Sequence, residues 1–126
     1  MHPFRSAVEA RDLDAALALL ADDVVLRSPV TFKPYRGREA VGMILTAVSE
    51  VFEDFSYARE IGAADARDHA LVFNARVGDK EVEGCDFVHM DDDGLIDELV
   101  VMVRPMSGVL ALAEAMSAKL AAAQAG

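Results

Sequence analysis

The chain has 126 residues, of which 53% are hydrophobic and 27% charged, so it is long enough for one folded domain with its own core and too short for two. Its net charge of −10 predicts neither binding to a nucleic-acid backbone nor attachment to an anionic membrane. A single cysteine, Cys85, excludes an internal disulfide and fits a reducing compartment, and we find no apolar run of membrane-spanning length. We expect one cytoplasmic domain over residues 1–126.

The N-terminal part has helical patterns. A first helix is expected around residues 4–9, where Ser6 and Glu9 are spaced as a capping pair. Asp12 is the expected N-cap of a second helix over 13–20, because a short carboxylate can accept a bond from the first backbone amides.

A short strand over 24–28 is expected next. Pro29 and Pro34 then bracket an irregular stretch, since proline removes a backbone donor and restricts the residue before it. Gly37 opens a third helix that runs to about Phe52. Its apolar stripe consists of Val41, Ile44, Leu45, Val48 and Phe52.

The second half of the chain is mainly extended. Four strands separated by turn residues are predicted over 55–62, 69–77, 81–90 and 95–104. A last helix follows Pro105, with Val109, Leu112, Met116 and Leu120 in register. Helices followed by a long antiparallel meander predict an α+β domain with the helices on one face of the sheet. A strongly bent sheet wrapped round a helix leaves an opening where small ligands bind.

Asp86 is a carboxylate in the middle of a predicted strand. Because side chains alternate along a strand, it shares a face with Val82, Val88 and Met90. A charge on an apolar face costs several kcal/mol unless it is paired, hydrated or neutralised. Either the phase of this strand differs, or Asp86 is a functional group inside a cavity.

Several short motifs occur in a fixed order along the chain. They are Arg11-Asp12-Leu13-Asp14, Leu20-Ala21-Asp22-Asp23-Val24, Ser28-Pro29-Val30, Gly37-Arg38-Glu39-Ala40-Val41, Asp86-Phe87-Val88 and Asp93-Gly94-Leu95-Ile96. In this order and at this spacing the chain resembles the nuclear-transport-factor-2-like superfamily, which includes ketosteroid isomerase and the SnoaL-like polyketide cyclases. The resemblance covers nearly the whole chain. It implies a cone-shaped, cystatin-like α+β barrel, with N-terminal helices packed on a strongly curved, mainly antiparallel sheet, plus a C-terminal helix.

The resemblance also permits a comparison with the isomerase mechanism. That mechanism uses a carboxylate base and an oxyanion site made of a tyrosine and a protonated aspartic acid. Asp86 corresponds to the oxyanion aspartic acid, whereas Ser28 stands at the base and Phe4 at the tyrosine. A serine hydroxyl does not replace a carboxylate base, and phenylalanine has no proton to donate. Steroid-type isomerisation by that route is not expected.

By the same resemblance, alternate residues of two strands face the cavity. Asn74 then hydrogen-bonds Asp86 or a ligand, although periodicity alone fits the opposite phase, with Leu71 and Phe73 inward, nearly as well. We expect Asp86 to act as acid, base or hydrogen-bond donor. The expected ligand contacts are Phe4, Ser28, Val72, Asn74, Val88, Leu99 and Val101.

Cys85 and His89 have the same parity, but four residues of strand separate them by roughly 13 Å, too far to share a metal ion. They are expected on the outer face of the sheet with Phe87, Val100 and Met102, and this apolar face predicts a homodimer. The run at 91–94 is a hairpin turn and does not fit a calcium loop. We expect no metal and no cofactor.

The sequence thus predicts a small-molecule-binding protein with an internal apolar pocket. One hypothesis is an acid/base isomerase, cyclase or hydrolase that acts on a small apolar, oxygen-bearing compound. The alternative is a non-catalytic ligand-binding or dimeric interaction module that has lost the isomerase residues. The expected partners are a small apolar ligand and a second copy of the chain, without nucleic acid or membrane.

Overall fold

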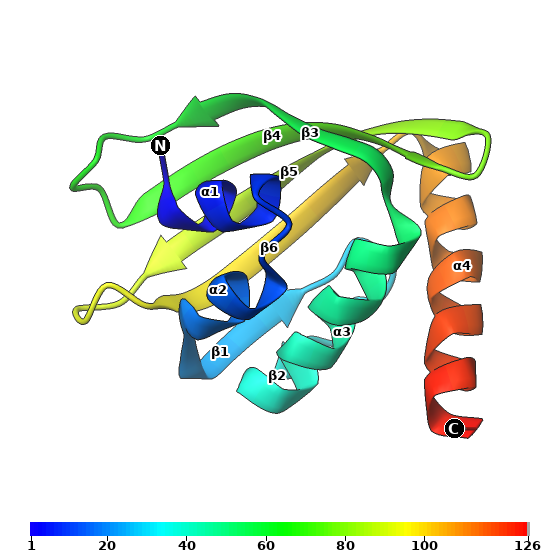
Figure 1. Ribbon diagram of the computed structural model, residues 1–126, viewed down its shortest axis with the longest axis horizontal. Coiled ribbons are helices and arrows are strands. Elements are labelled where there is room, and N and C mark those ends of the chain that lie inside the picture. The colour runs from blue at the N-terminus through cyan, green and yellow to red at the C-terminus, as the bar shows by residue number, and fades with distance from the viewer. Residues whose placement is uncertain (126) are drawn as a thin grey trace.

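The fold places four helices against one six-stranded sheet (Figure 1). The structure is a computed structural model and describes residues 1–125. In chain order the elements are α1 (Pro3–Glu9), α2 (Leu13–Ala18), β1 (Leu20–Arg27), β2 (Tyr35–Arg36), α3 (Arg38–Val51), β3 (Glu53–Ile61), β4 (Asp68–Val77), β5 (Lys80–Met90), β6 (Ile96–Arg104) and α4 (Met106–Ala125). The predicted α+β fold, with a C-terminal helix, is confirmed.

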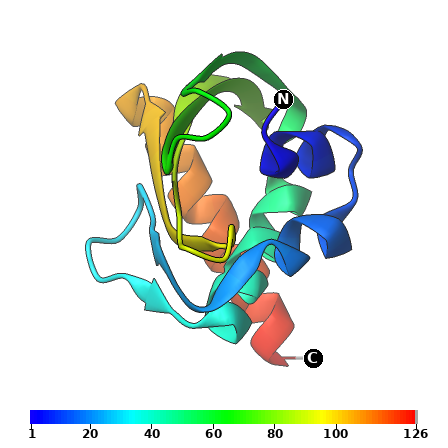
Figure 2. The same cartoon turned by 90° about the vertical axis from the view of Figure 1, so that its left-hand side faces the viewer.

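The sheet has the strand order β2-β1-β6-β5-β4-β3 and is antiparallel except where β1 runs parallel to β6. Figure 2 shows it strongly bent and unclosed, with α1, α2 and α3 on its concave side. The core lies between these helices and the inward residues of the strands. The largest fully buried side chains in it are Phe73, Leu20, Leu71, Ile96, Leu99, Val24, Val41 and Val88.

Two of the predicted helix starts are confirmed. Asp12 caps α2, because its Oδ1 accepts a bond from the Ala15 amide at 3.1 Å. Gly37 precedes α3 with φ 93°, a backbone conformation that glycine adopts without steric cost. Phe52 ends α3 as predicted.

The predicted boundaries of the first two helices differ from those observed. The capping pair of Ser6 and Glu9 is wrong: His2 caps α1, with its Nδ1 accepting a bond from the Phe4 amide at 3.0 Å. Pro3 occupies the first helical turn, where a missing amide costs nothing. α2 ends at Ala18 because Leu20 is already paired with Ile96 in the sheet.

α4 stands at one end of the sheet beside α3 (Figure 1). Its segment Met106–Ala123 has a mean hydropathy of 1.3 and matches a membrane-spanning helix by length and composition, so the sequence expectation that no such run exists was wrong. Many of these residues are alanine, and the helix packs on the domain through Leu112, with Met116 and Leu120 partly buried against the core. Only 17% of this segment is buried, so length and composition alone mark it as a candidate membrane span.

Candidate functional site

A cavity of about 440 Å³ lies between the helices and the concave face of the sheet. Most of its wall is apolar and comes from α1, α3, β6 and α4, together with aromatic side chains of β3 and β4. The main apolar lining residues are Phe4, Ala7, Ile44, Leu45, Phe52, Phe55, Phe73, Leu99, Val101, Leu112 and Met116. The polar and charged lining residues are Glu9, Arg11, Asp12, Ser28, Ser49, Ser56, Tyr57 and Asp86. This composition suits a mostly apolar molecule that carries a few polar atoms.

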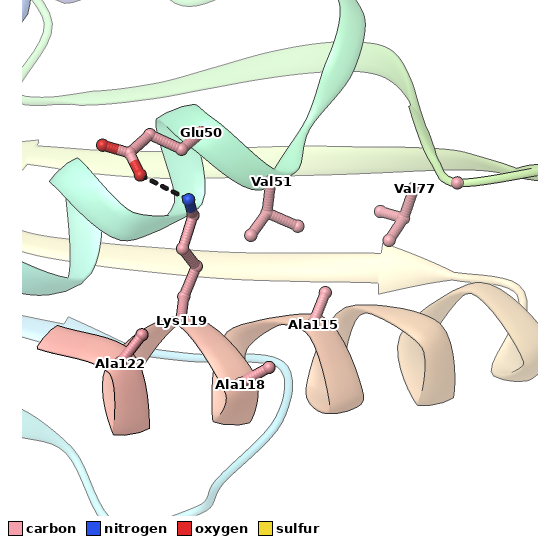
Figure 3. A pocket seen from close by; sticks show the side chains of 8 residues that line it. Glu50, Val51, Val77, Ala115, Ala118, Lys119 and Ala122 are labelled. Atoms are coloured by element: carbon pink, nitrogen blue, oxygen red, sulfur yellow. Dashed lines mark ion pairs between the residues drawn. The ribbon is translucent and has the colours of Figure 1, made fainter. Parts of the chain in front are cut away.

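A second hollow of about 410 Å³ is a shallow groove between α3 and α4 (Figure 3). Lys119 of α4 reaches across it to Glu50 of α3, with 2.7 Å between Nζ and Oε2. The remaining lining side chains are small or aliphatic. Its two charged groups neutralise each other, so this groove offers no free group for chemistry.

Asp86 of β5 faces the cavity and is only 8% exposed. The hydroxyl of Tyr57, on β3, donates a hydrogen bond to its Oδ2 at 2.8 Å. Strand pairing brings the two together: Tyr57 is opposite Phe73, and Asp86 is opposite Leu71, so both side chains lie on the inner face across β4. The predicted inward phase of Asp86 is confirmed.

Burial raises the pKa of Asp86 from 3.8 to about 7, although the hydrogen bond from Tyr57 acts in the opposite direction. Near neutral pH the carboxyl group is therefore present in both protonation states. Burial and the negative charge of Asp86 also raise the pKa of Tyr57, so its phenol keeps its proton. Because the one hydroxyl proton of Tyr57 is donated to Asp86, the group of this pair that can donate a proton to a ligand or accept one from it is Asp86.

Aromatic packing fixes the ring of Tyr57. Phe55 meets it edge to face at 5.0 Å between ring centroids, and the Arg5 guanidinium lies 5.9 Å from its centroid. Phe73 stacks on Phe55 at 4.7 Å and lies over Gly84, where a Cβ atom would come within 2.7 Å of its Cε2. Glycine at position 84 therefore lets Phe73 lie flat against the sheet, which keeps the cavity open.

The structure brings five of the predicted site residues together. Phe4, Ser28, Asp86, Leu99 and Val101 all line the cavity. The Ser28 hydroxyl accepts a bond from the Val30 amide at 3.0 Å and so stabilises the turn after β1.

The other predicted contacts need correction. Val72 is only partly buried and Asn74 is exposed, and neither lines the cavity. Residues directly opposite each other in an antiparallel pair point to the same side, so the pairing of Leu71 with Asp86 turns Leu71 inward and Val72 outward. The alternative phase is thus the one observed. Val88 is buried in the core and is not part of the cavity wall.

Tyr57 is the partner of Asp86 in the cavity that sequence reasoning missed. Its strand carries weak alternation, since Tyr57 is its only fully buried residue and the pairing with β4 shifts register on both sides of it. The available signal was a tyrosine two residues after Phe55 in a predicted strand. That signal does not show that β5, which carries Asp86, lies on the other side of β4 from Tyr57.

The outer face of the sheet is as predicted. Phe87 is 42% exposed and Met102 is 58% exposed, while His89 pairs with Asp68 at 2.8 Å between Nδ1 and Oδ1. Within residues 1–125, no three side chains of the metal-binding types are grouped closely enough to hold an ion.

Comparison with known proteins agrees with the architecture. A model of the SnoaL-like domain family matches residues 2–99. The chain is 48% identical to a steroid delta-isomerase from Pseudomonas aeruginosa, over 96% of this chain and 88% of that one, with a TM-score of 0.91. It is 36% identical to a bacterial protein with a cystatin-like fold from Silicibacter pomeroyi, over 94% and 86% of the two chains, with a TM-score of 0.87.

A SnoaL-like protein from Burkholderia thailandensis shares the fold at 20% identity, over 82% of this chain and 90% of that one, with a TM-score of 0.64. No curated protein matches the chain. The match to the family model covers most of the chain. The chain therefore belongs to the SnoaL-like domain family of the nuclear-transport-factor-2-like superfamily.

Proposed function

We propose that the protein binds a small, mostly apolar molecule in the cavity and that Asp86 contacts a carbonyl or hydroxyl oxygen of it. The observation that supports this most is the buried pair of Tyr57 and Asp86 in an otherwise largely apolar cavity wall. Burying a carboxyl group costs free energy unless the group is hydrogen-bonded or its charge is paired. Perturbed acids in cavities of this size are typical of functional sites.

The chemistry follows from the two protonation states of Asp86. In the neutral state the carboxyl proton is donated to a ligand oxygen, while Tyr57 holds the other carboxyl oxygen. This bond holds and polarises a ligand carbonyl, but in this state Asp86 does not also take up a proton from carbon, so the neutral state supports binding. In the ionised state Asp86 accepts a proton from a carbon next to a carbonyl group and returns it to another carbon of the same ligand. The reaction class supported best is proton transfer next to a carbonyl, as in an isomerisation.

The three-group steroid mechanism is not part of this proposal. A similar protein is described as a steroid delta-isomerase, but the family resemblance implies that Ser28 and Phe4 stand where that mechanism has its base and its tyrosine. The Ser28 hydroxyl is already engaged by the Val30 amide. We expect Asp86 to perform any proton transfer alone, in a one-base reaction, and steroid isomerisation to be very slow.

Binding of simple aryl ketones tests the proposal by calorimetry. Asp86→Leu should weaken binding by about tenfold or more, because a hydrogen bond to a group buried with it is lost. Asp86→Asn should lose less, since its amide still donates. Cys85→Ala changes the neighbouring residue on the opposite face and should bind as the wild type does. Equal affinities of wild type and Asp86→Leu would refute the role of Asp86.

A second candidate function is binding without catalysis, and the replacement of base and tyrosine by Ser28 and Phe4 favours it. Deuterium exchange separates the two. If Asp86 transfers protons, the bound ketone exchanges its α-hydrogens with D₂O faster with wild type than with Asp86→Asn, as followed by proton NMR. Equal exchange with both proteins, despite binding, would leave the binding function and exclude the catalytic one.

We also propose that two copies pair through the outer face of the sheet. Ile61, Phe87 and Met102 are exposed apolar side chains on β3, β5 and β6. Burying them between two copies removes apolar area from water. Phe87→Glu should convert a dimer to a monomer in light scattering, and a monomeric wild type would contradict the pairing.

A further inference from the structure

Arg11 occupies a backbone position that favours a different residue. It lies between α1 and α2 with φ 57°, in the left-handed region. The Asp12 amide bonds the Ala7 carbonyl at 2.9 Å and the Arg11 amide bonds the Val8 carbonyl at 3.0 Å. These two bonds form a Schellman motif, which ends a helix with one residue in the left-handed conformation. Glycine or asparagine is usual at that residue, because most other side chains are strained there.

Arg11 is exposed and is one of the residues that line the cavity containing Asp86. It therefore lies at an opening of that cavity. Two carboxylates line the same region, but each has a partner: Glu9 Oε1 is 3.1 Å from Arg5 Nε, and Asp12 Oδ1 accepts the Ala15 amide at 3.1 Å. Among residues 1–125, Arg11 forms no ion pair. In the part of the chain that the structure describes, it is the one Lys or Arg residue that lines the cavity.

Building on the proposed function, we infer that Arg11 binds an anionic group at the outer end of the ligand. The ligand class is then an apolar oxo-acid, with its oxygen at Asp86 and a carboxylate, or another planar or tetrahedral anion, at Arg11. The guanidinium fork suits such groups because it donates two parallel hydrogen bonds. The net charge of −10 repels anions at long range, but salt screens this repulsion beyond about 8 Å at physiological ionic strength. The charge of Arg11 therefore dominates the electrostatic interaction with an anion bound beside it.

The left-handed backbone makes the test sharp. Arg11→Asn removes the cation and inserts a residue that tolerates this conformation, so the variant should fold at least as well as the wild type. Arg36→Asn is the matched control, since it makes the same charge change on β2, outside the cavity lining. The probes are ω-oxo-ω-phenylalkanoates of increasing chain length and their methyl esters, with dissociation constants measured by calorimetry.

The wild type and Arg36→Asn should bind the best-fitting acid about tenfold more tightly than its ester. Arg11→Asn should bind acid and ester equally, with its ester affinity unchanged. An acid preference that survives in Arg11→Asn, or an ester bound as well as the acid by the wild type, would overturn the role of Arg11 and leave the proposed function intact. If the wild type bound neither acid nor ester, the proposed function would fall together with this inference. Alkylsulfonate and alkylphosphate analogues then separate the kinds of anion.

Discussion

Replacing Asp86 by asparagine should flatten the pH dependence of stability. In the folded chain the pKa of Asp86 is about 7, because burial raises it from its ordinary value of 3.8. Between these values the folded chain holds a proton that the unfolded chain has released. The free energy of unfolding therefore falls as pH rises, and the whole difference is about 4 kcal/mol, lost once the pH exceeds the folded pKa.

Urea unfolding of both proteins at about pH 5 and about pH 8.5 tests this, because about 3 kcal/mol of that difference lies in the interval. Relative to the wild type, the free energy of unfolding of Asp86→Asn should be higher by this amount at the higher pH than at the lower one. Subtracting the two proteins at each pH cancels contributions from other groups. Asp79→Asn, in the exposed turn between β4 and β5, is the matched control and should follow the wild type. Parallel pH curves for wild type and Asp86→Asn would refute the reasoning.

Three further predictions concern the surroundings of this group. Tyr57→Phe removes the donor to the ionised carboxyl, so the titration midpoint of Asp86 in carbon-13 NMR should rise by about 1 to 2 pH units, and a lower midpoint would contradict the hydrogen bond. Gly84→Ala forces the ring of Phe73 into the cavity, so it should destabilise the chain by about 1–3 kcal/mol in urea unfolding and weaken ketone binding. The control Gly42→Ala on α3 meets only ordinary contacts and should be neutral or stabilising. The pKa of His2 is lowered, chiefly by burial, so stability should fall as pH drops below 6.5. His2→Asn keeps a capping acceptor that does not titrate, so this variant should lose less stability in acid. An equal loss of stability in acid for variant and wild type would count against this role.

Local signals predicted much of the fold. Asp12 and Gly37 begin α2 and α3 as expected, because capping and left-handed backbone depend on residues close in sequence. The inward phase of Asp86 followed from alternation along one long strand. Such features need no knowledge of what packs against them.

Features that depend on pairing between strands could not be read from the sequence. The phase of β4 was ambiguous because Leu71 and Val72 are equally apolar, and only the pairing of Leu71 with Asp86 decides it. Tyr57 bonds Asp86 across β4, so predicting the contact requires the register of β3 on β4 and that of β4 on β5. The β3–β4 pairing also contains two irregularities. The short strand β2 has two residues, too few for any alternation. His2 as a cap was missed because histidine seldom takes that role.

The measurement that tests the central claim most directly is the titration of the Asp86 carboxyl carbon by NMR, in the free protein and with an aryl ketone bound. If the cavity holds a proton donor for a ligand oxygen, the free carboxyl titrates near pH 7, and the bound ketone raises its pKa further because it accepts a bond from the neutral form. A pKa close to 3.8 in the free protein, or one that a bound ketone leaves unchanged, would contradict the account.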